Sequence, residues 1–277
     1  MSHRILALGA AALALALTLP AQTQTPQTQT PQTQTPGIVV ERIRASVAPD
    51  IPAGNRIITL VRVDLSRYRL RILTEERHGE RRSVPRWVRD HNLAGAINAG
   101  MFLPSGRSVG FMMQDGDVVS NRNVAKYHGV VGFDPRGEGN PMLAIGGRGC
   151  SAGLDRFRRR YRNVLQAYRM IDCRGRAVQW PNRKRYSAAG FGVDDEGRAV
   201  FMHTRTPYRM TQLNRMLADG HGLRGMIYME GGPEASLVVN AEGQRVAEIG
   251  SYEDGFNEND DNDVFWQVPN VVAFEAR

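Results

Sequence analysis

Two apolar runs separated by a glycine-proline turn constrain this chain more than any other feature. The segment 227–239 holds both runs, with Gly231, Gly232 and Pro233 between them. Short apolar runs bounded by glycine and proline predict strands joined by a sharp turn. Glu230 ends the first run, beside glycines whose missing Cβ lets a ligand approach the backbone. The sequence therefore predicts a ligand-binding carboxylate here, or alternatively a structural turn with a solvated glutamate.

Residues 38–277 predict one domain that is rich in strands. Apolar residues and arginines alternate over 56–65 and again over 68–73, as in strands with one solvated face. Helices are expected over 84–91 and 211–218, and over part of the segment 154–169. Strands and helices do not alternate strictly, and no linker divides the segment. We therefore expect an α+β fold, a single domain on a mixed, largely antiparallel β-sheet with few helices.

The N-terminal sequence predicts export. A short basic start precedes an apolar run from Ile5 to Leu19, and Ala21 offers a small residue for cleavage. This pattern is typical of a signal peptide over residues 1–21, with an uncleaved anchor as the alternative. Three copies of Gln-Thr-Gln-Thr-Pro follow, so residues 22–37 are expected to form a disordered linker. No later stretch is long and apolar enough to cross a bilayer, so we expect no stable membrane span after signal cleavage.

The chain has two cysteines, Cys150 and Cys173. In an exported protein, periplasmic or secreted, a single pair is expected to form a disulfide. Both flanks are basic and hydrophilic, so the bridge is expected to pin an insertion and not the core. A catalytic thiol is the alternative, but neither cysteine has a histidine close to it in the sequence.

Positive charge is concentrated in one segment. The chain has 36 basic and 28 acidic residues, and 12 of the basic residues lie within 148–185, which has only two acidic ones. In an exported protein such a segment favours anionic glycans, phospholipid head groups or phosphorylated sugars as partners, and no nucleic acid is expected in that compartment. The alternative is a solvated charged face.

A second motif, 98–102, also follows an apolar stretch. Together with the segment 227–239 it resembles the phosphodiester glycosidase domain family, whose usual forms are Asn-Gly-Gly-Phe-Phe and Asp-Gly-Gly-Gly-Ser-Ser. Asn98, Gly100 and Phe102 match the first form, whereas Ala99 and Met101 depart from it. The positions that fit the second form are Gly231, Gly232 and Ser236, with Glu230 in place of the aspartate.

The resemblance covers roughly residues 56–274 and includes a tail, Ser251-Tyr252-Glu253 through Pro269-Asn270, that is typical of a bacterial exported branch. It implies a hydrolase that cleaves the glycosidic bond of a sugar-1-phosphodiester, with a phosphorylated sugar or envelope glycan as substrate. Such cleavage usually needs two carboxylates. Glu230 is then the base or nucleophile, Glu234 is the second carboxylate or a sugar ligand, and Asn98 binds the sugar or orients a carboxylate. The remaining substrate-binding positions are Gly100, Phe102, Gly231, Gly232 and Ser236.

A phosphate leaving group needs charge stabilisation more than protonation. Arg205 can bind phosphate through two parallel hydrogen bonds, and His203 can donate to it or serve as an acid. Arg185 is a further candidate. The alternatives are a surface arginine and a core histidine bonded to the backbone. We expect Asn98 and Glu230 to meet at the same edge of one sheet, with Glu234 and His203 bordering their cleft.

The segment Asp254–Asp263 is dense in oxygen ligands, which calcium prefers, but its spacing does not match the twelve-residue EF-hand loop. A turn-rich loop beside the site is the favoured interpretation, and no cofactor is predicted. The alternative for the whole chain is a non-catalytic envelope protein that binds anionic or phosphorylated polysaccharide through its arginine-rich segment.

Overall fold

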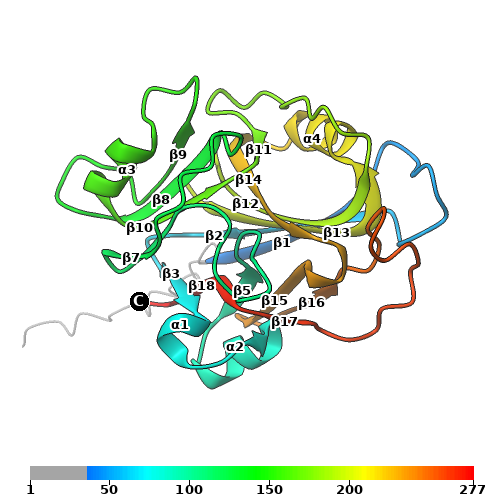
Figure 1. Ribbon diagram of the computed structural model, residues 1–277, viewed down its shortest axis with the longest axis horizontal. Coiled ribbons are helices and arrows are strands. Elements are labelled where there is room, and N and C mark those ends of the chain that lie inside the picture. Colours follow the sequence, from blue (N-terminus) through cyan, green and yellow to red (C-terminus); the bar gives the residue numbers. More distant parts are fainter. Residues whose placement is uncertain (1–35) are drawn as a thin grey trace, which may run out of the picture. The chain divides into compact units, whose positions relative to one another are not determined.

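The computed structural model describes residues 36–277 (Figure 1). The predicted signal peptide at 1–21 and all but the last two residues of the predicted linker at 22–37 lie outside the described residues. None of the helices within 36–277 is long and apolar enough to span a membrane.

The strands form three main sheets. From edge to edge, the first sheet consists of β1 (Ile38–Arg44), β2 (Ile57–Val63), β13 (Ala199–Arg209), β12 (Arg185–Asp194), β14 (Leu223–Gly231) and β11 (Arg169–Ile171). The second consists of β7 (Asp117–Ser120), β6 (Met112–Gln114), β10 (Tyr161–Ala167), β8 (Gly129–Pro135) and β9 (Leu143–Gly147). The third consists of β16 (Gln244–Ile249), β15 (Ser236–Ala241), β5 (Gly95–Asn98), β18 (Asn270–Ala276) and β3 (Tyr68–Thr74). A short pair joins β17 (Gln267–Val268) to β4 (Arg82–Ser83).

The expected α+β class is confirmed. Neighbouring strands in residues 36–277 pair in antiparallel fashion, for example β12 with both β13 and β14. The strands divide among three sheets, where the sequence suggested one. Figure 1 shows the long strands β12, β13 and β14 curving through the middle of the domain, with the second sheet at the upper left.

Phenylalanine rings join the three sheets. Phe133 on β8 meets Phe191 on β12 with ring centroids 6.2 Å apart, and Phe191 meets Phe201 on β13 at 5.0 Å. Phe201 then meets Phe274 on β18, also at 5.0 Å. All four side chains are buried in one cluster. Burial stabilises the fold by roughly 1.5–3 kcal/mol for each such side chain, so this contact line fixes how the sheets lie against one another.

The helices are short, and three of them pack buried side chains against sheets. They are α1 (Glu75–His78), α2 (Val84–Asp90), α3 (Leu154–Arg160) and α4 (Met210–Ala218). In α2, Trp87 is fully buried and its Nε1 donates a hydrogen bond of 3.1 Å to the Val268 carbonyl. In α4, Leu213 and Leu217 pack with Leu60 and Met202 on the outer face of the first sheet. The helices expected at 84–91 and 211–218 are therefore present with bounds shifted by one residue.

The segment 154–169, which the sequence predicted to be partly helical, is helical as far as Arg160. Residues Tyr161–Ala167 form β10, which lies between β6 and β8 at the centre of the second sheet. A central strand buries both faces, so apolar residues such as Val164 and Leu165 stand side by side and imitate a helical stripe. The segment is thus part of the core and is not the peripheral insertion that its arginines suggested.

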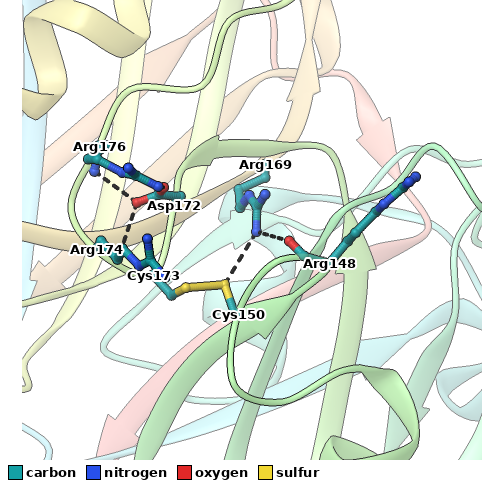
Figure 2. Close-up of a disulfide and its surroundings, with 7 residues drawn as sticks. All are labelled: Arg148, Cys150, Arg169, Asp172, Cys173, Arg174 and Arg176. Carbon is teal, nitrogen blue, oxygen red and sulfur yellow. Dashed lines mark hydrogen bonds and ion pairs between the residues drawn. A yellow bond between two sulfur atoms is a disulfide. The ribbon is translucent and has the colours of Figure 1, made fainter.

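The predicted disulfide between Cys150 and Cys173 is present, with Cα atoms 6.1 Å apart (Figure 2). It ties the loop after β9 in the second sheet to the turn after β11 in the first sheet. The Arg169 guanidinium supports the same link, because its Nη1 donates to the Arg148 carbonyl at 2.8 Å and contacts the Cys150 sulfur at 3.3 Å. The bridge therefore joins two sheets, which its hydrophilic flanks did not reveal.

Replacing both cysteines by serine should lower the free energy of unfolding by about 3 kcal/mol, because the open chain regains the entropy of a loop of 23 residues. Urea unfolding of the oxidised protein and of the double variant measures this difference. Alkylation of the native protein without reductant should modify neither cysteine. Two reactive thiols, or equal unfolding midpoints, would contradict the bridge.

Candidate active site

The two sequence motifs meet at a turn between sheets. β14 ends at Gly231, and the single-turn 3₁₀ helix η1 (Gly232–Glu234) carries the chain into β15 of the third sheet. The Asn98 side chain, at the end of β5, accepts a hydrogen bond of 3.0 Å from the backbone N–H of Ser236. The expectation of one shared sheet edge is therefore wrong, because Glu230 and Asn98 belong to different sheets and approach each other only through η1.

Three carboxylates surround η1. A Cβ added to Gly232 would stand 2.7 Å from Oε2 of Glu253 and 3.5 Å from Oε2 of Glu234, so both oxygens lie beside this one glycine. Gly232 also has a φ of +62°, which an L side chain rarely adopts. Glu230 precedes it and accepts a hydrogen bond of 3.1 Å from the N–H of Gly231. The turn thus depends on a glycine both for its conformation and for space.

Burial and mutual repulsion raise the pKa values of this cluster. Burial is the largest cause for Glu230, whose pKa rises to about 8 even though the Gly231 N–H opposes the shift, and the charges of Glu234 and Glu253 add to it. Burial and Glu253 raise the pKa of Glu234 to about 7. Burial also raises the pKa of Glu253, with Lys184 opposing. Closely spaced carboxyl groups titrate as a unit, so the cluster retains protons at neutral pH.

An aromatic wall lies beside the cluster. Neighbouring rings along it have centroids 4.5 Å apart (Tyr127 and Tyr168), 4.9 Å (Tyr168 and Trp180), 5.4 Å (Trp180 and Tyr228) and 6.4 Å (Tyr228 and Tyr186). The Tyr228 hydroxyl lies next to the Cα of Gly231, where it leaves no space for a Cβ. Burial and the glutamates raise the pKa of Tyr228, so its hydroxyl keeps its proton and can donate. Aromatic faces with a few polar groups suit a ligand that has both apolar and polar surfaces.

His203 lies inside the core. It is 1 % exposed, and its Nε2 lies 3.2 Å from the Ala235 carbonyl, which can only accept. Burial lowers its pKa to about 4, so the ring is neutral at physiological pH. This geometry matches the alternative interpretation of a core histidine bonded to the backbone.

Arg205 and Arg185 hold the acidic loop. Arg205 donates to the Asp260 carboxylate at 2.7 Å and to the backbone carbonyls of Ile249, Asp260 and Asn262. Arg185 binds both carboxylate oxygens of Asp254, at 2.8 and 2.9 Å. Their guanidinium groups are therefore engaged by protein. The geometry favours a structural role over the phosphate-binding role that the sequence suggested.

The acidic loop is organised by these arginine pairs. Within residues 36–277 no group of three or more His, Cys, Asp or Glu side chains is arranged to hold a metal ion. The calcium site considered for Asp254–Asp263 therefore gains no support from this part of the chain. The arginine pairs have another effect, because they fix the segment that carries Glu253.

The other predicted residues lie around the turn or on the loop after β5. Ser236 is fully buried and its hydroxyl donates to the Glu234 carbonyl at 3.2 Å. Asn98 is 1 % exposed, and its Nδ2 has no hydrogen-bond partner among the described residues. Gly100 has a φ of +68°. Phe102 lies farther along, under the Arg81 guanidinium at 5.7 Å from the ring centroid.

Sequence reasoning did not assign Glu253 to the site. It belongs to the Ser251-Tyr252-Glu253 stretch that supported the family resemblance, and that stretch was the only available signal. An isolated β-bridge between Tyr186 and Glu253 brings the loop beside β12. Such a contact between residues 67 positions apart has no local sequence pattern.

Comparison with known proteins places the chain in a family. The phosphodiester glycosidase family model matches residues 91–275. The structure resembles the catalytic domain of zebrafish N-acetylglucosamine-1-phosphodiester alpha-N-acetylglucosaminidase, auto-inhibited by its pro-peptide, with a TM-score of 0.63 and 15 % identity over 88 % of this chain and 85 % of that chain. It also resembles a hypothetical protein from Synechocystis, with a TM-score of 0.59 and 14 % identity over 87 % of this chain and 62 % of that one. No curated protein sequence matches.

The family match covers more than half of the chain. The protein therefore belongs to the phosphodiester glycosidase family, as its sequence motifs predicted. At these identities the two solved structures establish a common fold.

Glu230→Gln should make the free energy of unfolding less dependent on pH. Because folding raises the pKa of Glu230 from 4.5 to about 8, the stability linked to this group is fully present below pH 4.5 and is lost as the pH rises towards 8. The neutral variant should then be more stable than the wild type at pH 8 by about 1–3 kcal/mol. Urea unfolding at pH 5 and pH 8 measures this. Glu138→Gln, at an exposed position, is the matched control and should change nothing.

Proposed function

We propose that this protein hydrolyses the glycosidic bond of a sugar-1-phosphodiester. The observation that carries the proposal is the cluster of Glu230, Glu234 and Glu253 around Gly232, with raised pKa values, beside an aromatic wall. Family membership supports the reaction class. Grouping three partly buried carboxylates opposes folding, and this cost is easier to explain in a catalytic site than in a protein that only binds anionic polysaccharide. Perturbed pKa values at one place favour catalysis instead.

The raised pKa of Glu230 changes the catalytic role that we assign to this residue. The sequence suggested a base or nucleophile, but a carboxyl with a pKa of about 8 holds its proton at neutral pH. We therefore assign it as the acid, which gives its proton to the phosphate oxygen as the bond to the anomeric carbon breaks. The departing phosphate monoester then leaves with one charge fewer, which matters beside other carboxylates. Glu234 or Glu253, whichever is ionised, takes the proton of the attacking water or attacks the anomeric carbon itself.

The cation that we assign to stabilise the departing phosphate also differs from the one that the sequence predicted. Because Arg205 and His203 are engaged elsewhere, we assign this role to Lys184, whose charge acts on Glu253 and opposes the rise of its pKa. It is exposed, and its Nζ donates to the Asp254 carbonyl at 3.2 Å, directly after Glu253. An ammonium at this place can approach a phosphate as it leaves.

We also propose that the protein is exported to the periplasm or secreted. The signal-like N-terminus and the Cys150–Cys173 bridge support this, since such bridges persist in oxidising compartments. The mass of the mature protein, measured from a producing cell, tests it. Protein that retains residues 1–21 and stays in the cytoplasm would contradict the proposal.

Glu230→Gln should lower kcat/KM on sugar-1-phosphodiesters by at least about 100-fold while the protein stays folded, because glutamine cannot supply a proton. Wild-type activity should decline as the pH rises through about 8, where Glu230 ionises. The measurement is the release of free sugar from a panel of sugar-1-phosphodiesters, followed by mass spectrometry.

Controls separate chemistry from folding. Glu253→Gln should also lose activity, whereas Glu138→Gln should keep it. Arg205→Ala should lower thermal stability, because the acidic loop loses four hydrogen bonds. If folded Glu230→Gln turns over at the wild-type rate, the acid is another residue. If the wild type cleaves no member of the panel, the proposed function is wrong.

A further inference from the structure

The arginine-rich segment lines an open cavity that the proposed reaction does not use. The cavity has a volume of about 490 Å³ and lies between two stretches of chain, 123–130 and 147–159. Three arginines line it, Arg148, Arg156 and Arg159. They come from the loop after β9 and from α3, and the opposite wall carries His128.

These arginines are not neutralised by carboxylates. Among the described residues, the side chains of Arg148 and Arg159 have no hydrogen-bond or ion-pair partner, and that of Arg156 donates only to the Ser151 carbonyl at 3.2 Å. In Figure 2 the Arg148 side chain extends away from the disulfide and the residues around it. The cavity also has one carboxylate, Asp155, but this side chain is 82 % exposed and its contact, at 4.0 Å, is with Arg158. The net charge of the lining is therefore positive.

The surroundings of His128 agree with a positive potential. Burial lowers its pKa first, and the charges of Arg148 and Arg169 lower it further. The ring therefore stays neutral at physiological pH, so the positive charge of the cavity comes from its arginines.

The fold holds one wall of this cavity firmly. Gly147 has a φ of +114° and lies against the His128 carbonyl, where a Cβ would have no space. The backbone N–H of Arg148 donates to the same carbonyl at 3.2 Å. Cys150, three residues after Gly147, is held by the disulfide. Arg148 is therefore mounted on a loop fixed at both sides.

The cavity lies beside the carboxylate cluster. Tyr127 lines the cavity, and its ring is 4.5 Å from that of Tyr168, at the end of the aromatic wall. Lys126, the next residue, places its ammonium 5.6 Å from the same Tyr168 ring. The negative charge of Glu230 contributes to the raised pKa of Tyr127, so the two sites are electrostatically in range. The cavity and the cluster therefore lie at two places along the same line of ring contacts, of which Tyr168 and Trp180 are partly exposed.

We propose that this cavity binds the polyanionic, phosphate-bearing part of a glycan whose terminal sugar lies at the carboxylate cluster. The inference rests on the proposed function only in treating that glycan as a substrate. The binding itself follows from unpaired arginines on a rigid wall, since guanidinium groups bind phosphate with paired hydrogen bonds. Steering of a polyanion towards the cluster would follow from the same charges.

The test is calorimetric titration of the oxidised, full-length protein with poly(glycerol phosphate), with uncharged dextran as the neutral control. Arg148→Ala/Arg159→Ala should raise the Kd for poly(glycerol phosphate) about tenfold or more, because two charge-assisted contacts are lost. The matched control is Arg42→Ala/Arg245→Ala, which removes the same charge from exposed positions on β1 and β16. Its Kd should stay within about twofold of the wild type, as expected for surface charges far from the ligand. Cys150→Ser/Cys173→Ser should weaken binding as well, because the Arg148 loop is released.

Two outcomes overturn the inference: equal weakening in both double arginine variants, which would mean attraction by net charge alone, or unchanged affinity in Arg148→Ala/Arg159→Ala. Thermal melts establish that each variant is folded. Because no turnover is needed, the result is independent of catalysis. A protein that cleaves sugar-1-phosphodiesters but whose Arg148→Ala/Arg159→Ala variant binds normally keeps the proposed function and loses this site. A wild-type protein that cleaves no substrate, but whose Arg148→Ala/Arg159→Ala variant binds poly(glycerol phosphate) more weakly, keeps this site and loses the proposed function.

Discussion

The ring contacts of Phe133, Phe191, Phe201 and Phe274 are the interaction on which the rest of the structure depends. Each sheet alone has an apolar face that it must bury, and these rings provide the common interior. The candidate site lies where the chain crosses from the first sheet to the third, so its geometry is set by how those sheets are stacked. A core substitution that shifts one sheet would therefore displace Glu230 relative to Asn98 without touching either residue.

The cluster of three carboxylates opposes folding, and ion pairs in the neighbouring acidic loop offset this cost. Glu230, Glu234 and Glu253 are brought together although burial and repulsion disfavour their charged forms. Arg185 and Arg205 pull the acidic loop into place through Asp254 and Asp260, so that Glu253 is held beside Gly232. Stabilising ion pairs thus surround a destabilised centre, an arrangement that is common where function requires strained electrostatics.

Local patterns predicted part of this structure. The fold class, the Cys150–Cys173 bridge and the family followed from strand periodicity, cysteine number and two short motifs. Tertiary contacts decided the rest. Residues 161–167 form a strand because they are buried on both faces, and the sequence spacing could not distinguish that from a helix. His203 and Arg205 were assigned by residue type, but the core enclosed one and the acidic loop occupied the other. Glu253 was missed because only the folded chain brings it to Gly232.

The placement of Glu253 on a loop makes loop position and protonation one equilibrium. Beside Gly232, Glu253 adds negative charge to the cluster and increases the proton affinity of Glu230 and Glu234. A substitution that displaced Glu253 from Gly232 would therefore lower the proton affinity of both carboxyl groups and release protons to solvent at neutral pH.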